Sequence, residues 1–505
     1  FTACHFHRVC TPTNYSRIIK PRKKFAKCLL KEKIDLTIVI RFRMKDSSGK
    51  GVTKEMEKNL TSGSVFQNIV WFSLPYLLSY FLQTLYGMAD LFIIGQFEGV
   101  AGTTAVSIGS QVMHMITVML VGIAMGSTVM IGRYVGERKE EEKRMTVGNT
   151  SIIFMILSLI VTLILLFFIN PIVSIMSTPV EAIQETTLYL KICFIGIPFI
   201  TAYNIISSIF RGLGDSKRPM YFVAVACFFN IVLDFIFIGY FNMHAVGAAF
   251  GTVISQLISV IVALFAIIKR KLIVIHRYHL KLHKKIIKDI FKIGFPISMQ
   301  DGLIQVSFII ITVIANMRGV DIAAAVGVVE KIISFLFLVP SSMLSAISAI
   351  CAQCVGTKQH QRARQTLRYG MMIALGFGIF FAITCQFISK EILSLFTSEA
   401  IVIIYGSQYL KGYVLDCMFA SIHFCFSGFF TAYGYSMISF IHNVISIALI
   451  RVPGAYITSK LFPDTLLPMG LTPALGSILS ALICITVFIV MKKKNKFDFQ
   501  KTSSK

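Results

Sequence analysis

The stretch MYFVAVACFFNIVLDFIFIGYF, residues 220–241, is apolar over enough length to cross a bilayer as one α-helix. It carries a carboxylate, Asp234, and an amide four residues earlier, Asn230. A carboxylate inside a membrane helix costs about 2.5–3.5 kcal/mol even on the lenient insertion scale. The four-residue spacing places both side chains on one helical face, where their oxygens suit a proton or a small hard cation. The plainer alternative is a polar contact that holds two helices together.

The composition of the whole chain agrees with a membrane setting. Of its 505 residues, 55% are hydrophobic and 14% are charged, whereas a soluble domain carries about 25% charged residues. The formal net charge is +25, but the basic residues lie in short loops between apolar spans. Binding to nucleic acid needs a continuous basic face instead. We therefore expect membrane lipids around the chain and no nucleic-acid partner.

Apolar spans alternate with short polar loops from Ile69 onward, and their lengths fit membrane helices, some of them tilted. The sequence predicts an all-α polytopic membrane protein with about twelve transmembrane helices in two six-helix bundles. The first six spans cover residues 69–95, 103–135, 146–169, 183–209, 220–241 and 245–268. The second six cover residues 290–316, 322–354, 366–388, 401–430, 437–459 and 468–491.

Basic residues gather in the loops after five of the six even-numbered spans, which predicts the orientation of the chain. These loops follow spans 2, 4, 6, 8 and 12 and contain Arg138, Lys139, Lys217, Arg218, Lys358, Arg362 and Lys492–Lys494, with a basic run over Lys269–Lys288. The alternate loops hold few basic residues, namely Arg318, Lys390 and Lys460. The positive-inside rule then predicts a multi-pass protein of the cell (plasma) membrane with both termini in the cytoplasm.

The chain repeats itself at an offset of 220 residues. Phe210-Arg-Gly-Leu-Gly-Asp-Ser216 recurs as Phe430-Thr-Ala-Tyr-Gly-Tyr-Ser436, and Val135-Gly136 recurs as Val355-Gly356. Two tandem six-helix units with the same orientation form the parallel-repeat architecture of many secondary transporters. The predicted parts are a basic, disordered N-terminal extension, an N-terminal lobe, a basic linker, a C-terminal lobe and a basic tail, over residues 1–68, 69–268, 269–289, 290–491 and 492–505. The extension is read as sequence upstream of a start at Met44 or Met56.

Motifs for enzymatic chemistry are missing from the sequence. Gly212-Leu-Gly-Asp-Ser-Lys217 lacks the spacing of an ATP-binding loop and follows no strand, so we interpret it as a tight turn. No serine-hydrolase elbow, zinc-binding His pair or kinase motif set is present. We expect no enzyme activity, no cofactor and no metal site, and we expect transport energy to come from an ion gradient.

Five acidic residues lie within the predicted spans: Asp90, Asp234, Asp301, Glu330 and Asp416. If the first span packs on the fifth, Asp90 and Asp234 can share a proton or a cation, because two close carboxylates repel each other. Asp416 and Glu330 are the candidates in the second lobe, whereas Asp301 is expected near the cytoplasmic interface.

Prolines and glycines within the spans predict bends and flexibility. The prolines are Pro75, Pro198, Pro296 and Pro340, which are expected to interrupt their spans, and the glycines are Gly122, Gly126 and Gly132 in the second span. Ordinary irregularity of membrane helices is the alternative interpretation at each position.

Taken together, these motifs resemble the bacterial-type multidrug and toxic compound extrusion (MATE) family over residues 65–491. The matching pieces, in order, are Met88–Gly95, Val135-Gly136, Arg211–Lys217, Asn230–Asp234 and Val246–Thr252. The resemblance implies two six-helix bundles around a V-shaped cavity and cation-coupled efflux driven by H⁺ or Na⁺. In members with a first-lobe cation site, the matching positions here are Asp90, Asn230, Asp234 and Thr252, with Tyr189 as a further match. No second-lobe cation site is carried over from the family.

The leading hypothesis is therefore an antiporter that exports organic cations, drugs or related small amphipathic compounds in exchange for H⁺ or Na⁺. A flippase for lipid-linked precursors is the alternative within the same superfamily, and it calls for a strongly cationic cavity. Two alternatives from other classes are disfavoured. The sequence lacks the catalytic motifs of a membrane enzyme, and a purely structural scaffold does not explain five acidic residues within the spans. A monomer is expected.

Overall fold

The computed structural model describes residues 59–497, except residues 177, 270–275 and 496. All regular elements in these ranges are helices, and twelve helical segments are long and apolar enough to cross a membrane. The prediction of an all-α polytopic protein is confirmed. The predicted N-terminal extension up to residue 58, residues 270–275 of the linker and most of the basic tail lie outside the described residues.

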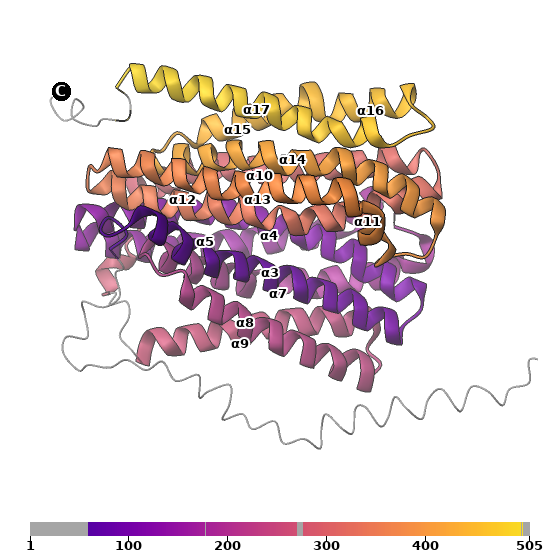
Figure 1. Cartoon of the computed structure of the whole chain (residues 1–505). Coiled ribbons are helices and arrows are strands. Elements are labelled where there is room, and N and C mark those ends of the chain that lie inside the picture. The colour runs from indigo at the N-terminus through magenta and orange to yellow at the C-terminus, as the bar shows by residue number, and fades with distance from the viewer. Residues whose placement is uncertain (1–58, 177, 270–275, 496, 498–505) are drawn as a thin grey trace, which may run out of the picture. The chain divides into compact units, whose positions relative to one another are not determined.

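Helices from the first half of the sequence form the N lobe, and those from the second half form the C lobe. In Figure 1 the indigo-to-magenta helices lie below the orange-to-yellow ones. The N lobe consists of α3 (Val65–Phe97), α4 (Val100–Glu137), α5 (Glu140–Phe167), α6 (Ile169–Ile175), η2 (Val180–Ala182), α7 (Ile183–Gly212), α8 (Lys217–Asp234), η3 (Phe235–Tyr240) and α9 (His244–Lys269). After η4 (Arg277–Leu280), the C lobe consists of α10 (Lys284–Asn316), α11 (Val320–Leu336), α12 (Leu338–Gly356), α13 (His360–Ser394), α14 (Ala400–Ala432), α15 (Ser436–Ser446), η5 (Ile447–Arg451), α16 (Val452–Leu461) and α17 (Leu467–Lys493).

Most of the predicted spans extend by a few residues in the structure. For example, α10 begins at Lys284 and α13 at His360, six residues before the predicted apolar spans at 290 and 366. Their first turns are polar, and a helix continues past the hydrocarbon wherever its backbone hydrogen bonds continue, whereas hydropathy detects only the apolar part.

The interruptions within spans are not where the prolines predict them. Pro75, Pro198 and Pro296 lie inside continuous helices, and only Pro340 lies near a break, which separates α11 from α12. Instead, the fifth and eleventh spans each contain a π-helical segment, η3 and η5. Such segments widen the helix locally and occur frequently at functional sites.

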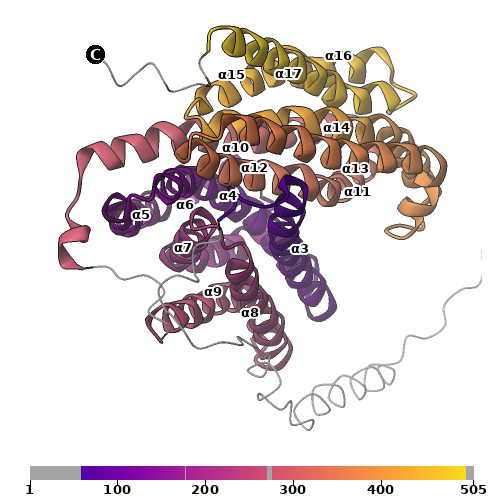
Figure 2. The same cartoon turned by 60° about the vertical axis from the view of Figure 1, so that its left-hand side comes forward.

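The two lobes pack together through α4, which lies against α10 and α12 in both views (Figures 1 and 2). Gly122 and Gly126 bring its backbone against Ser298 and Ile290 of α10. These glycines therefore permit close approach within a continuous helix, rather than interrupting it. One buried apolar cluster contains residues of both lobes, whereas two other large clusters belong to one lobe each.

Candidate functional site

Four polar side chains of the N lobe meet in its interior. Asp90 comes from α3, Asn230 and Asp234 come from α8, and Thr252 comes from α9. Asp234 is 0% exposed, Asn230 1% and Asp90 3%. The Thr252 hydroxyl donates a hydrogen bond to Asp90 Oδ2 at 3.2 Å. The structure therefore brings together residues that are 162 positions apart in the sequence.

The carboxyl groups of Asp90 and Asp234 lie close enough to interact electrostatically, and Asn230 lies beside Asp90. Both oxygens of Asp234, Oδ1 of Asp90 and the amide of Asn230 find no hydrogen-bond partner among the described residues. No described Lys or Arg interacts with either carboxylate. Because a buried, unpaired charge is very costly, these carboxyl groups must be neutralised, and their oxygens are suited to hold a proton or a small cation.

The local chain explains why Asp234 points into this space. It is the last residue of α8, directly before the π-helical segment η3. Opposite it, Gly251 of α9 presents only backbone, and a Cβ there would collide with Asp234 Oδ1. Sequence reasoning did not single out Gly251, although it lies next to Thr252 in the motif Val246–Thr252.

Tyr189 belongs to the surroundings of the site rather than to its centre. Its hydroxyl forms a hydrogen bond with Ser110 at 3.2 Å, and its ring lies where a Cβ on Gly109 would collide with it. It is close enough to interact electrostatically with Asp90, yet no hydrogen bond joins the two residues. Tyr189 therefore packs α7 against α4 beside the acid pair.

The acid in the C lobe has a different environment. Asp416 of α14 is 0% exposed, and Arg451 Nη2 lies 3.6 Å from its Oδ2. The same guanidinium nitrogen donates a hydrogen bond to the Tyr413 hydroxyl at 2.6 Å. Glu330 of α11 accepts a hydrogen bond from Thr312 at 3.2 Å, with Arg451 nearby. In the C lobe, Arg451 therefore lies close to both Asp416 and Glu330.

Asp301, which the sequence predicts near the cytoplasmic interface, lies within α10. α10 runs over Lys284–Asn316, so Asp301 stands close to the middle of a 33-residue helix. Gln300 donates a hydrogen bond to its Oδ1 at 3.4 Å. The helix starts at Lys284, six residues before the predicted apolar span begins at 290.

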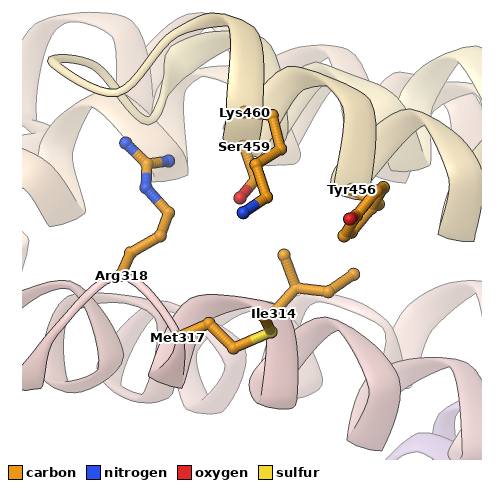
Figure 3. A pocket seen from close by; sticks show the side chains of 6 residues that line it. All are labelled: Ile314, Met317, Arg318, Tyr456, Ser459 and Lys460. Carbon is orange, nitrogen blue, oxygen red and sulfur yellow. The ribbon is translucent and has the colours of Figure 1, made fainter.

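A small cavity of about 70 Å³ lies between α10 and α16, and none of these acids lines it (Figure 3). Its lining side chains are Ile314, Met317, Arg318, Tyr456, Ser459 and Lys460. Sites for drug-sized ligands measure about 300–1,000 Å³, so this cavity is too small to be a substrate site.

The fold and the buried acids define a multi-pass membrane protein of the transporter class, built from two related bundles. A family model described as MatE matches the sequence twice, over residues 75–236 and 296–457. The two matches together cover more than half of the chain, which therefore belongs to the MATE family of multidrug efflux transporters. Members of this family transport small compounds and are not enzymes.

Individual relatives agree with this assignment. The chain is 30% identical to a probable multidrug resistance protein, YoeA, of Bacillus subtilis (strain 168), over 66% of this chain and 74% of that protein. It is 25% identical to the multidrug export protein MepA of Staphylococcus aureus (strain NCTC 8325 / PS 47), over 83% and 91% of the two chains. A solved structure of a multidrug resistance MATE family transporter in an outward-facing conformation matches the fold with a TM-score of 0.81, at 22% identity, over 88% and 100%.

Proposed function

We propose that this chain is a secondary active antiporter that exports organic cations, drugs or related amphipathic compounds in exchange for H⁺ or Na⁺. One observation carries the proposal: Asp90 and Asp234 are buried together and interact with no described basic residue. The names of the relatives support the export of drugs.

The acid pair provides a physical link between ion binding and conformation. Without an ion, the pair carries negative charge that must remain hydrated. With a proton or a cation bound, it can be closed off from water at much lower cost. An ion gradient therefore changes the populations of the conformations that expose the site to one side or the other. Asn230 and Thr252 supply further oxygens to the bound ion.

The proposed orientation has both termini in the cytoplasm, because the loops after α4, α7, α9 and α12 are rich in Lys and Arg. Single cysteines at Lys139, Lys281 and Lys390, all of which are exposed, test this proposal in a cysteine-free background. Impermeant thiol reagents outside intact cells should label position 390 and leave 139 and 281 unlabelled. Labelling of position 281 from outside would overturn the orientation.

Transport in proteoliposomes under separately imposed pH and Na⁺ gradients tests the function and identifies the ion. Export of a fluorescent organic cation under one gradient, abolished by collapsing it, is the expected result. Export that responds to neither gradient would contradict the antiporter. The flippase alternative predicts translocation of a lipid-linked pyrophosphate in the same vesicles, and the two N-lobe acids disfavour such an anionic substrate.

A further inference from the structure

The repeated motifs form two matching helix ends. α7 and α14 both finish in a turn with a left-handed glycine, Gly214 (φ 89°) and Gly434 (φ 80°). In each turn the next residue closes back on the helix: Asp215 N donates to Phe210 O, and Tyr435 N donates to Phe430 O, both at 2.8 Å. This is the Schellman pattern, which leaves the carbonyl two residues before the glycine without a partner inside the turn.

Each of these free carbonyls accepts a hydrogen bond from the other lobe. Arg133 of α4 donates to Ala432 O at the end of α14, with Nε at 3.0 Å and Nη2 at 2.6 Å. Gln353 of α12 donates through Nε2 to Gly212 O at the end of α7, at 3.5 Å. Both donors and both acceptors are separated by the repeat offset of 220 residues, so the two contacts are related by the internal duplication.

The backbones of α4 and α12 meet between these two contacts. A Cβ on Gly136 would collide with Gln353 O, and a Cβ on Gly356 would collide with Arg133 O. A Cβ on either glycine would also lie 3.0 Å from the Cα of the other. The sequence repeat Val135-Gly136 and Val355-Gly356 is thus a point of contact between the lobes, at the end of the helices that carries the basic loops.

The other end of α4 packs within its own lobe. Gly102 and Gly109 face Glu185 and Tyr189 of the N lobe. The close approaches of α4 to the C lobe are therefore concentrated toward its C-terminal end, where the apolar cluster shared by both lobes includes Val129 and Ile350. The lobes are closed against each other at the basic-loop end.

We propose that Arg133 and Gln353 are paired latches that hold this end closed, and that Arg133 dominates the balance between the closed and the open conformation. The proposal rests on the transport function proposed above, because alternating access requires both latches to break. Arg133 places two charged donors on one carbonyl at the negative end of the α14 dipole. Gln353 offers one neutral donor at a longer distance.

The orientation of the Gln353 amide is fixed by a further contact. Its Oε1 accepts a hydrogen bond from Leu60 N at 3.1 Å, which directs Nε2 toward Gly212 O. Arg362 in turn binds the carbonyl oxygens of Leu60 and Ser62, at 3.1 and 2.8 Å. The weaker latch is thereby tied to the segment before α3, whereas Arg133 contacts Ala432 directly.

Distances between spin labels test the latches in the full chain reconstituted in lipid nanodiscs, with no gradient present. Labels at Lys217 and Gln361, both exposed at the basic-loop end of different lobes, report closure. Arg133→Gln should raise the ratio of open to closed populations about tenfold, because hydrogen bonds to charged groups are the stronger ones. Gln353→Ala should raise it less, and Arg133→Lys, which keeps a charged donor, should remain mostly closed.

Lys139→Gln is the matched control, because it removes a positive charge just after α4 from an exposed side chain whose ion pair is with Glu137 of the same helix. Its distances should equal those of the unmodified chain. Unchanged distances in Arg133→Gln, or an equal shift in Arg133→Lys, would overturn the proposal. If Arg133→Gln opens the lobes in a chain that exports no organic cation, the latch is supported and the proposed function is contradicted, so the two failures are distinguishable.

Discussion

The two lobes share a fold and a duplicated sequence, yet the surroundings of their buried carboxylates differ: those in the N lobe have no described basic partner, and Asp416 in the C lobe has one. In the N lobe, Asp90 and Asp234 face each other with no described basic partner. In the C lobe, Arg451 lies 3.6 Å from Asp416. An acid with its own guanidinium has its charge balanced within the protein, whereas an acid pair without one depends on an ion from solution. This difference supports our proposal that ion coupling belongs to the N lobe, whereas the charge of Asp416 in the C lobe is compensated within the protein.

The largest effect is expected from Asp234→Asn, which removes the carboxylate at nearly constant volume. Gradient-driven export should fall to the background of empty vesicles, because the site no longer exchanges charge between the two sides. Folding should be retained, since the substitution removes a buried charge instead of stranding one. The measurements are efflux from proteoliposomes and equilibrium substrate binding, and binding is expected to survive.

The matched control is Asp464→Asn, which neutralises an exposed carboxylate in the loop before α17 and should leave export unchanged. Export at the unmodified rate from Asp234→Asn would remove coupling from the N lobe. Asp416 and Glu330 would then be the carboxylates to test.

Arg451→Gln tests the other half of the comparison. It leaves Asp416 without its cation, so we expect a loss of about 3–5 kcal/mol in the free energy of unfolding. Thermal unfolding in detergent, followed by light scattering or by the fluorescence of an extrinsic dye, measures this loss of stability. The double variant Asp416→Asn, Arg451→Gln should recover much of the lost stability. A double variant no more stable than Arg451→Gln alone would show that the pair is not what balances the charge.

Gly251→Ala sharpens the comparison by disturbing the acid pair without changing any charge. The added Cβ would collide with Asp234 Oδ1, so the carboxylate must leave its present position beside Asp90. We expect the apparent affinity for the coupling ion to fall by about tenfold or more. An interaction with a charged group contributes about 1.5–3 kcal/mol, and each 1.4 kcal/mol is a factor of ten in affinity. Gly327→Ala is the control, because no atom lies within 4 Å of the Cβ there. Equal behaviour of the two variants would argue against close packing at Asp234.

The smallest effect is expected from Thr252→Val, which removes the hydroxyl that donates to Asp90 Oδ2 at 3.2 Å. A hydrogen bond to a charged group contributes roughly 1.5–3 kcal/mol, and its length places this one at the weak end, so about a tenfold weaker ion dependence is expected. Export measured against ion concentration gives the shift. Thr252→Ser keeps the hydroxyl and should show the ion dependence of the unmodified chain. If Thr252→Ser needs as much ion as Thr252→Val for the same export, the methyl group of Thr252 matters and the hydroxyl does not.

Much of this protein was predictable from its sequence, because the membrane imposes simple rules on each helix separately. Apolar length located the twelve spans, and four-residue spacing placed Asn230 and Asp234 on one face. The 220-residue offset revealed the duplication, and both copies of its longest motif end a helix with a left-handed glycine. These features depend on the local chain and its solvent alone.

Only the tertiary structure decided which distant groups meet. Nothing local shows that Arg451 reaches Asp416, that Gly251 faces Asp234, or that Arg133 bonds to a carbonyl 299 residues away. Hydropathy likewise does not detect the polar first turns of α10, which begins six residues before the predicted span. Contacts between helices depend on which faces pack and at what depth, and those are set by the whole bundle, because every helix is apolar enough to tolerate several neighbours.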